Sequence, residues 1–251
     1  TPTDSSAASD VYKRQGQNFL VDSNTINKIV SSIDFTKNDR LLEIGPGKGA
    51  ITMKLGENAK SLTAIEIDSK LCNMLKKDCK KNIKIINDDF MKIDLENIDA
   101  NIIVGNLPYY ITTPILFKIF QSKLDWEKGY FLMQKEVAER IVSLPNKKSY
   151  GRLTIMCQVF SNPKILFNIS PNVFRPVPKV DSSFVEFTRN KKYEIIDYIR
   201  FENIIRKIFN KRRKKLKNCI DDEMKLNIDS KSDLLEKRPE NISIEEFIQL
   251  I

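Results

Sequence analysis

The 251-residue chain contains no histidine. Without imidazole it has no Ser-His-Asp or Cys-His nucleophile, no His-based general acid–base catalyst and no His-ligated metal site. Any reaction that the chain catalyses therefore depends on other side chains and on the backbone.

Cysteine is also scarce, and the four copies, Cys72, Cys79, Cys157 and Cys219, are too widely spaced for a zinc knuckle or a dense disulfide framework. We interpret them as buried free thiols in a reducing compartment, and we predict no metal site. No apolar run approaches the ~18 residues of a membrane span, and no charged start followed by an apolar stretch indicates a secretory signal. The sequence therefore predicts a cytosolic protein with no membrane partner.

Positive charge is in excess, with 42 Lys and Arg against 33 Asp and Glu and a formal net charge of +9. The hydrophobic share of 41% is enough for a core of ordinary size and argues against disorder along most of the chain. The charge suggests a polyanionic partner, but a composition rich in Lys, Asn and Ile is also a genome-wide bias in some organisms. The net charge alone therefore does not decide whether the chain binds nucleic acid.

The order of predicted elements indicates an α/β protein. Residues 1–15 lack apolar periodicity and are interpreted as a disordered or non-native tail. An amphipathic stripe from Ile26 to Ile33 predicts a first helix, and strands then alternate with helices beginning near Ala50 and Ser69. The expected strands are Arg40–Ile44, Leu62–Ile67, Ile83–Ile86, Ile102–Val104, Phe131–Met133 and an edge hairpin strand at Phe184–Phe187. This rhythm predicts a doubly wound, Rossmann-like domain over residues 16–189.

After Arg189 the strand signals stop and the charge density rises. A helical stripe runs from Phe201 to Phe209, and Ser243 with Glu246 forms a capping box before a last apolar segment. We predict a small all-helical C-terminal domain over residues 190–251.

Polar residues follow the predicted strands where a ligand would bind. Gly45, Gly47 and Gly49 follow the first strand, and the spacing favours a nucleoside ligand over a dinucleotide because the third glycine is one position early. Glu66 ends the second strand, where an acid accepts hydrogen bonds from ribose hydroxyls, and Asp89 ends the third, where it suits an adenine amine. Each acid alone is also compatible with a solvated strand end, but together with the glycine loop they predict one ligand crevice.

The fourth strand ends in Asn106-Leu-Pro-Tyr109, in which a fixed backbone, an amide acceptor and an aromatic face suit a planar amino group. With Glu43-Ile-Gly-Pro-Gly-Lys-Gly49 and Glu66-Ile-Asp68, this motif looks like an S-adenosylmethionine-dependent methyltransferase acting on an exocyclic amine. Further motifs resemble the KsgA-type small-subunit (16S) rRNA adenine N6,N6-dimethyltransferases: Gly16-Gln-Asn-Phe-Leu20, Gln134-Lys-Glu-Val-Ala138, Tyr150-Gly-Arg-Leu153, Phe174-Arg-Pro-Val-Pro-Lys-Val-Asp-Ser182 and Lys211-Arg-Arg-Lys-Lys-Leu-Lys-Asn218.

The resemblance implies dimethylation of two adjacent adenines near the 3′ end of small-subunit rRNA during ribosome biogenesis, by an enzyme that acts as a monomer on an immature subunit. Three alternatives remain: a checkpoint factor in subunit assembly with methylation secondary, a large-subunit rRNA methyltransferase that confers macrolide resistance, and a methyltransferase-fold transcription factor of the mitochondrial kind. Asp181, where the resistance enzymes usually have Asn, argues against the second, and the intact Asn106-Leu-Pro-Tyr109 argues against the third.

The resemblance also implies roles for individual residues. Cofactor binding is implied for Asn18, Leu20, Gly45, Gly47, Glu66, Ile67, Asp89, Phe90 and Asn106. Binding and activation of the target base are implied for Asn106, Leu107, Pro108, Tyr109 and Phe174, although Phe174 also reads as a core aromatic beside a proline turn. RNA phosphates are expected to meet Arg140, Lys147, Lys148, Arg152, Lys211, Arg212, Arg213, Lys214 and Lys215. Asp88 is an adjacent competitor for the role of Asp89, but the resemblance implies that the acid stands directly before Phe90.

Overall fold

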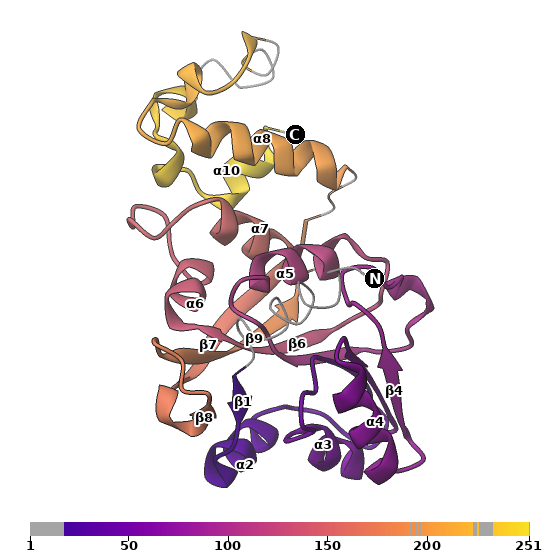
Figure 1. Ribbon diagram of the computed structural model, residues 1–251. Helices are drawn as coiled ribbons and strands as arrows, with labels where there is room; N and C mark the ends of the chain where they lie inside the picture. The colour runs from indigo at the N-terminus through magenta and orange to yellow at the C-terminus, as the bar shows by residue number, and fades with distance from the viewer. Residues whose placement is uncertain are drawn as a thin grey trace, which may run out of the picture. The chain divides into compact units, whose positions relative to one another are not determined.

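The computed structural model describes residues 18–190, 192–193, 195, 197–222, 225 and 233–250 (Figure 1). The predicted tail at residues 1–15, and the first two residues of the Gly16–Leu20 motif, lie outside these ranges. The chain divides into two compact units. Among the described residues, one unit contains 18–135 together with Ile165–Phe187, and the other contains Glu136–Lys164 and those from Thr188 onward. The second unit thus begins earlier in the sequence than the expected boundary at residue 190, because Glu136–Lys164 belongs to it.

A mostly parallel sheet of seven strands, in the order β4-β3-β2-β5-β6-β9-β7, organises the fold. The neighbouring pairs from β4 to β6 are parallel, with Leu41 of β2 level with Leu62 of β3 and Ile102 of β5. The strands are β2 (Arg40–Ile44), β3 (Ser61–Glu66), β4 (Ile83–Asn87), β5 (Ile102–Asn106), β6 (Lys128–Gln134), β7 (Ser161–Ile169) and β9 (Ser182–Arg189). A separate antiparallel pair joins β1 (Phe19–Leu20) to β8 (Phe174–Arg175). The predicted Rossmann-like sheet is confirmed.

Apolar stripes place helices on both faces of this sheet, which Figure 1 shows with α5 opposite α2, α3 and α4. These helices are α2 (Ser23–Ser31), α3 (Thr52–Asn58), α4 (Ser69–Asp78) and α5 (Thr112–Gln121). Asp68 caps α4 by accepting from the backbone of Lys70, and only two residues separate the end of β3 from the start of this helix. Leu55 and Leu75 pack with Leu41 in one buried cluster. The helices thereby pack against the sheet through this shared core.

The prediction for one edge of the sheet was wrong. Phe184–Phe187 was expected to be an edge hairpin strand, but β9 lies between β6 and β7, and its first four residues are all buried. The edge is β7, which the sequence did not predict. Its residues are mostly half-buried or exposed, and Pro163 lies near its start. A strand with a single partner tolerates proline and polar residues, so its pattern is weaker than that of an interior strand.

The second unit is built mainly from short helices: α6 (Lys135–Ile141), α7 (Arg152–Phe160), α8 (Tyr198–Asn210) and α10 (Ile244–Ile248). Phe209 of α8 packs against Phe247 of α10 with ring centroids 5.7 Å apart. The predicted capping box forms, because the Ser243 hydroxyl accepts from the Glu246 backbone and the Glu246 carboxylate accepts from the Ser243 backbone. None of the helices in the described parts of the chain is long and apolar enough to cross a membrane.

Candidate active site

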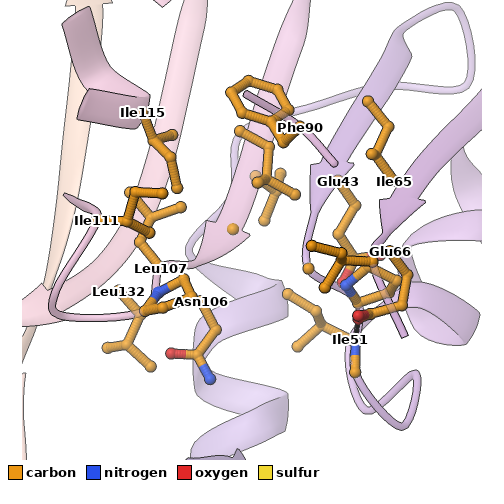
Figure 2. A pocket seen from close by; sticks show the side chains of 18 of the residues that line it. Glu43, Ile51, Ile65, Glu66, Phe90, Asn106, Leu107, Ile111, Ile115 and Leu132 are labelled. Atoms are coloured by element: carbon orange, nitrogen blue, oxygen red, sulfur yellow. Dashed lines mark hydrogen bonds between the residues drawn. The ribbon is translucent and has the colours of Figure 1, made fainter. Parts of the chain in front are cut away.

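A cavity of about 330 Å³ opens in the first unit where the parallel strands β2, β3, β4 and β5 end. Residues that follow these strands line it, together with the segment Asn18–Leu20. Figure 2 shows Asn106 and Leu107 on one side of the cavity and Glu43 and Glu66 on the other. Ligands of open parallel sheets bind at such carboxyl ends, so this cavity is the candidate active site.

The glycine-rich loop after β2 takes backbone conformations that other residues rarely adopt. The φ angle is +67° at Gly45, +59° at Gly47 and +79° at Gly49. At Gly47 an added Cβ atom would also lie 3.1 Å from the Phe19 ring. The Lys48 ammonium lies 5.2 Å from the centroid of the same ring. Glycine therefore leaves bare backbone facing the cavity while Phe19 packs over the loop.

Glu66, at the end of β3, is 3% exposed and lines the cavity. One carboxylate oxygen accepts from the Gly47 backbone at 3.0 Å, and the other accepts from the Asp68 backbone at 2.9 Å. Burial raises the pKa of this carboxyl, and the two backbone donors oppose that rise. The carboxylate is thus held at the base of the glycine loop and keeps lone pairs for a ligand with hydroxyl donors.

Both acids at the end of β4 line the cavity, the predicted Asp89 and its competitor Asp88. The exposed Asp88 side chain accepts from the Asp89 backbone at 2.7 Å. The half-buried Asp89 side chain accepts from the Met91 backbone at 2.9 Å. The Phe90 ring is 7% exposed and forms part of the wall. This segment offers a carboxylate and an apolar ring side by side, as an adenine site requires.

Asn106 ends β5, and its amide is held in one orientation. Its Nδ2 donates to the Asn18 backbone carbonyl at 2.9 Å. Because that bond uses the amino group of the amide, the Oδ1 acceptor is left for a ligand in the cavity. Asn18 is brought there by β1, where Leu20 pairs with Phe174 of β8. The segment Asn18–Leu20 therefore lines the cavity and also orients the Asn106 side chain.

The residues after Asn106 are also fixed. The Leu107 backbone donates to the Leu132 carbonyl at 3.0 Å, which extends the β5–β6 pairing by one residue. The Pro108 carbonyl accepts from the backbone of Ile111 and from the Thr112 hydroxyl, each at 3.1 Å, so it is already engaged in the turn that starts α5.

Tyr109 follows in the cavity wall, and its hydroxyl shares a hydrogen bond of 2.6 Å with the Ser182 hydroxyl. Burial raises the pKa of Tyr109, and the bond to Ser182 opposes that rise. The phenol therefore stays neutral, and the bond anchors the ring at the cavity wall.

Phe174 does not line this cavity. Its ring is fully buried and belongs to the core cluster that includes Ile29 and Phe184. The sequence offered a core aromatic as the alternative to a base-stacking role, and the structure places the ring in the core. The β1–β8 pairing explains this position, since it carries Phe174 inward beside Leu20. Ile67, in contrast, is 49% exposed and lines the cavity mouth, where it is available to a ligand.

Glu43 lines the cavity, although the sequence analysis gave it no role of its own. It lies inside β2, it is 1% exposed, and its Oε2 has no hydrogen-bond partner among the described residues. Burial, with a smaller contribution from the charge of Glu66, raises its pKa to about 8, and Thr52 opposes the rise. The signal in the sequence was an acidic residue inside an otherwise apolar strand, directly before the glycine loop.

The nine basic residues predicted to bind RNA all belong to the second unit. Four of them form ion pairs inside that unit, namely Arg140 with Glu136, Arg152 with Glu202, Arg212 with Glu240 and Lys215 with Glu236. Lys211 donates to the Asn218 carbonyl at 3.3 Å. Within the described residues, no side-chain partner is found for Lys147, Lys148, Arg213 and Lys214. These four are the cations most available to an anion.

Arg212 contacts two other parts of the second unit. Its Nε pairs with Glu240 at 2.7 Å, and its guanidinium also donates to the Lys148 carbonyl at 2.7 Å. It therefore ties the loop that carries Lys147 and Lys148 to the end of α8, and its charge is partly neutralised within the unit.

The chain is similar to known proteins along nearly all of its length. Residues 9–251 match the family model described as ribosomal RNA adenine dimethylase. The Ribosomal RNA small subunit methyltransferase A of Clostridium botulinum (strain ATCC 19397 / Type A) is 40% identical, covering 95% of this chain and 92% of that protein. The protein of the same name from Francisella tularensis subsp. novicida (strain U112) is 39% identical, with 95% of each chain covered.

Solved structures agree in fold. A dimethyladenosine transferase from Plasmodium falciparum superposes with a TM-score of 0.83 at 25% identity, covering 92% of this chain and 95% of that one. The 23S rRNA methyltransferase ErmE has a TM-score of 0.68 at 24% identity, covering 93% of this chain and 99% of that one, and shares the fold.

Proposed function

Because the chain belongs to the ribosomal RNA adenine dimethylase family, we propose that it transfers methyl groups from S-adenosylmethionine to N6 of two adjacent adenines near the 3′ end of small-subunit rRNA, while the subunit is being assembled. One observation carries the proposal for the chemistry. The oriented amide of Asn106 and the buried carboxylate of Glu66 face one cavity from opposite sides. The relatives named Ribosomal RNA small subunit methyltransferase A support the choice of RNA.

The cavity residues fit this cofactor. Bare backbone at Gly45 and Gly47 leaves room for close approach, and the Glu66 carboxylate suits the ribose hydroxyls. The Glu66 carboxylate and the acids after β4 make the site electronegative, which suits a ligand with a positive charge. When bound, S-adenosylmethionine supplies a methyl group on a cationic sulfur, which is a good leaving group because it departs as a neutral thioether.

Asn106 activates the base in this proposal. An adenine amine is a poor nucleophile because its nitrogen lone pair is conjugated with the ring. The Asn106 Oδ1 accepts one N–H of that amine and thereby favours the geometry in which the lone pair points toward the methyl group. The Leu107 carbonyl is the natural second acceptor, because the Pro108 carbonyl is already engaged in its turn. Tyr109 offers an anchored face for stacking the flipped base.

This mechanism explains how a chain without histidine is an enzyme. The residues hold the amine and the methyl donor in line, and most of the rate comes from that positioning. The proton that the amine loses after transfer passes to water, because the methylated amine is a strong acid before it loses the proton. No side chain with a pKa near 7 is required for that step.

The test is transfer of labelled methyl groups from S-adenosylmethionine to unmethylated small subunits and, in parallel, to large-subunit rRNA, followed by nucleoside analysis. We expect N6,N6-dimethyladenosine in the small-subunit RNA alone. Label in the large-subunit RNA would support a resistance enzyme instead, and no label in either RNA would support a factor that only binds.

Glu66→Gln is expected to weaken binding of S-adenosylhomocysteine by about tenfold to a hundredfold, since a charged acceptor of hydroxyl donors contributes ~1.5–3 kcal/mol. The amide would also set an N–H against one of the two backbone donors that Glu66 now accepts. Calorimetric titration measures the effect. Glu57→Gln, which changes an acid on α3 in the same way, is the matched control and should bind as the wild type does.

Lys148→Ala combined with Lys214→Ala is expected to weaken binding to unmethylated small subunits and to reduce the salt dependence of that binding. If each lysine meets one phosphate, the slope of log K against log salt falls by about 1.4–1.8. A pair of exposed lysines in the first unit, changed together as Lys60→Ala and Lys84→Ala, controls for net charge. Equal slopes in the two double variants would remove these two residues from the RNA surface.

A further inference from the structure

Lys118 lies on α5, outside the cavity, yet its ammonium contacts the segment that forms the cavity wall after β4. The half-buried side chain donates to the Met91 carbonyl at 2.9 Å and to the Ile93 carbonyl at 2.5 Å. The same ammonium lies 5.6 Å from the centroid of the Phe90 ring. One side chain therefore contacts Phe90, Met91 and Ile93 of the segment that carries the predicted adenine site.

Besides the hydrogen bonds accepted by the Asp88 and Asp89 side chains, backbone bonds shape that segment. Residues 88–94 belong to no helix or strand, and the turn is closed by bonds from the Lys92 and Ile93 backbone to the Asp89 carbonyl at 2.8 and 3.2 Å. Those bonds fix Asp89 but supply no donor to the carbonyls of Met91 and Ile93. Lys118 supplies both donors, so the course of the chain beyond Asp89 depends on it.

The charges around Lys118 support a persistent contact. Burial lowers its pKa, whereas the negative charges of Asp89, Asp94 and Asp88 oppose that change. A cation that donates to two carbonyl oxygens in the field of three nearby acids is favoured there over one that extends into solvent.

The position of Lys118 on α5 adds a second connection. This helix starts directly after the Asn106–Ile111 loop, which carries the target-base site. The lysine therefore links the helix that follows this loop to the segment that carries Asp89 and Phe90. We propose that Lys118 is a positioning residue that holds the adenine end of the cofactor site in register with the methyl-transfer site. The inference rests on the proposed function, since it concerns the same cofactor.

Lys118→Met keeps the length of the side chain and removes both donors. We expect it to weaken binding of S-adenosylhomocysteine about tenfold, which corresponds to ~1.4 kcal/mol. Binding of 5′-methylthioadenosine should weaken by the same factor, because this ligand retains the adenine and ribose but lacks the amino-acid end. The KM for S-adenosylmethionine should rise, whereas kcat at saturating cofactor should stay within about threefold. Lys118→Arg, which still donates to both carbonyls, should recover most of the affinity.

Lys123→Met is the matched control, because Lys123 follows the same helix and forms an ion pair of 3.0 Å with Glu96, but its side chain is 80% exposed. It should bind both ligands as the wild type does. A Lys118→Met protein that melts at a lower temperature but binds both ligands within twofold of the wild type would overturn the inference, as would a loss confined to S-adenosylhomocysteine. Failure of the wild type to bind either ligand would instead overturn the proposed cofactor.

Discussion

Asn106→Ala should lower kcat for methyl transfer by about a hundredfold to a thousandfold, the loss typical of removing one polar group that stabilises a transition state. The alanine leaves the amine of the target base without its side-chain acceptor. Binding of S-adenosylhomocysteine should weaken by no more than about fivefold, because the bond from Nδ2 to Asn18 is worth only ~1 kcal/mol to the N-terminal segment. Single-turnover transfer to unmethylated small subunits measures the first effect, and calorimetry measures the second.

Asn106→Asp separates the two functions of the amide. The carboxylate still accepts from the amine, but it cannot donate to the Asn18 carbonyl, which would instead face a second acceptor. We expect this variant to lose more cofactor affinity than Asn106→Ala, but to retain a higher kcat than Asn106→Ala at saturating cofactor. Asn97→Ala, at an exposed side chain, is the control. A kcat for Asn106→Ala above a tenth of the wild-type value would remove Asn106 from the chemistry.

The sequence predicted where the strands end, and hence most of the cavity. Glu66 and Asn106 are polar residues at the ends of apolar strands, and parallel strands bring such ends to one edge of a sheet. The sequence could not predict which atoms these residues present. The orientation of Asn106 depends on a carbonyl 88 positions earlier in the chain, and the anchor of Tyr109 is a serine 73 positions later. Contacts over such separations have no local periodicity.

The basic residues illustrate a second limit. A run such as Lys211–Lys215 looks uniform in sequence, yet Arg212 is committed to Glu240 and to a loop carbonyl, while Lys214 has no side-chain partner among the described residues. Arg152 pairs with Glu202, 50 positions away. Whether a cation is free for RNA therefore depends on tertiary pairing, which composition does not report. The same applies to Phe174, whose aromatic ring suits either a stack or a core until the β1–β8 pairing is known.

The buried carboxyl of Glu43 gives a second large effect, on stability. Its pKa of about 8 in the folded protein lies well above the ordinary value of 4.5. Between those two values the folded state keeps a proton that the unfolded chain has lost, so rising pH favours unfolding. This contribution is absent below about pH 4.5, grows on the order of 1 kcal/mol for each pH unit, and levels off above pH 8.

Glu43→Gln removes this titrating carboxyl. The free energy of unfolding should therefore depend less on pH in the variant than in the wild type. Relative to the wild type, the variant should gain roughly 3 kcal/mol of unfolding free energy between pH 5 and pH 8, with no further gain at pH 9. The amide N–H groups, if unpaired, cost on the order of 1–3 kcal/mol, but that cost is the same at every pH and shifts the curve without changing its slope. Urea unfolding at each unit from pH 5 to pH 9 measures the difference, with Glu57→Gln on the adjacent helix α3 as the exposed control. Parallel curves for Glu43→Gln and the wild type would mean that Glu43 is ionised in the folded protein at neutral pH, and that its charge is balanced by groups around the cavity.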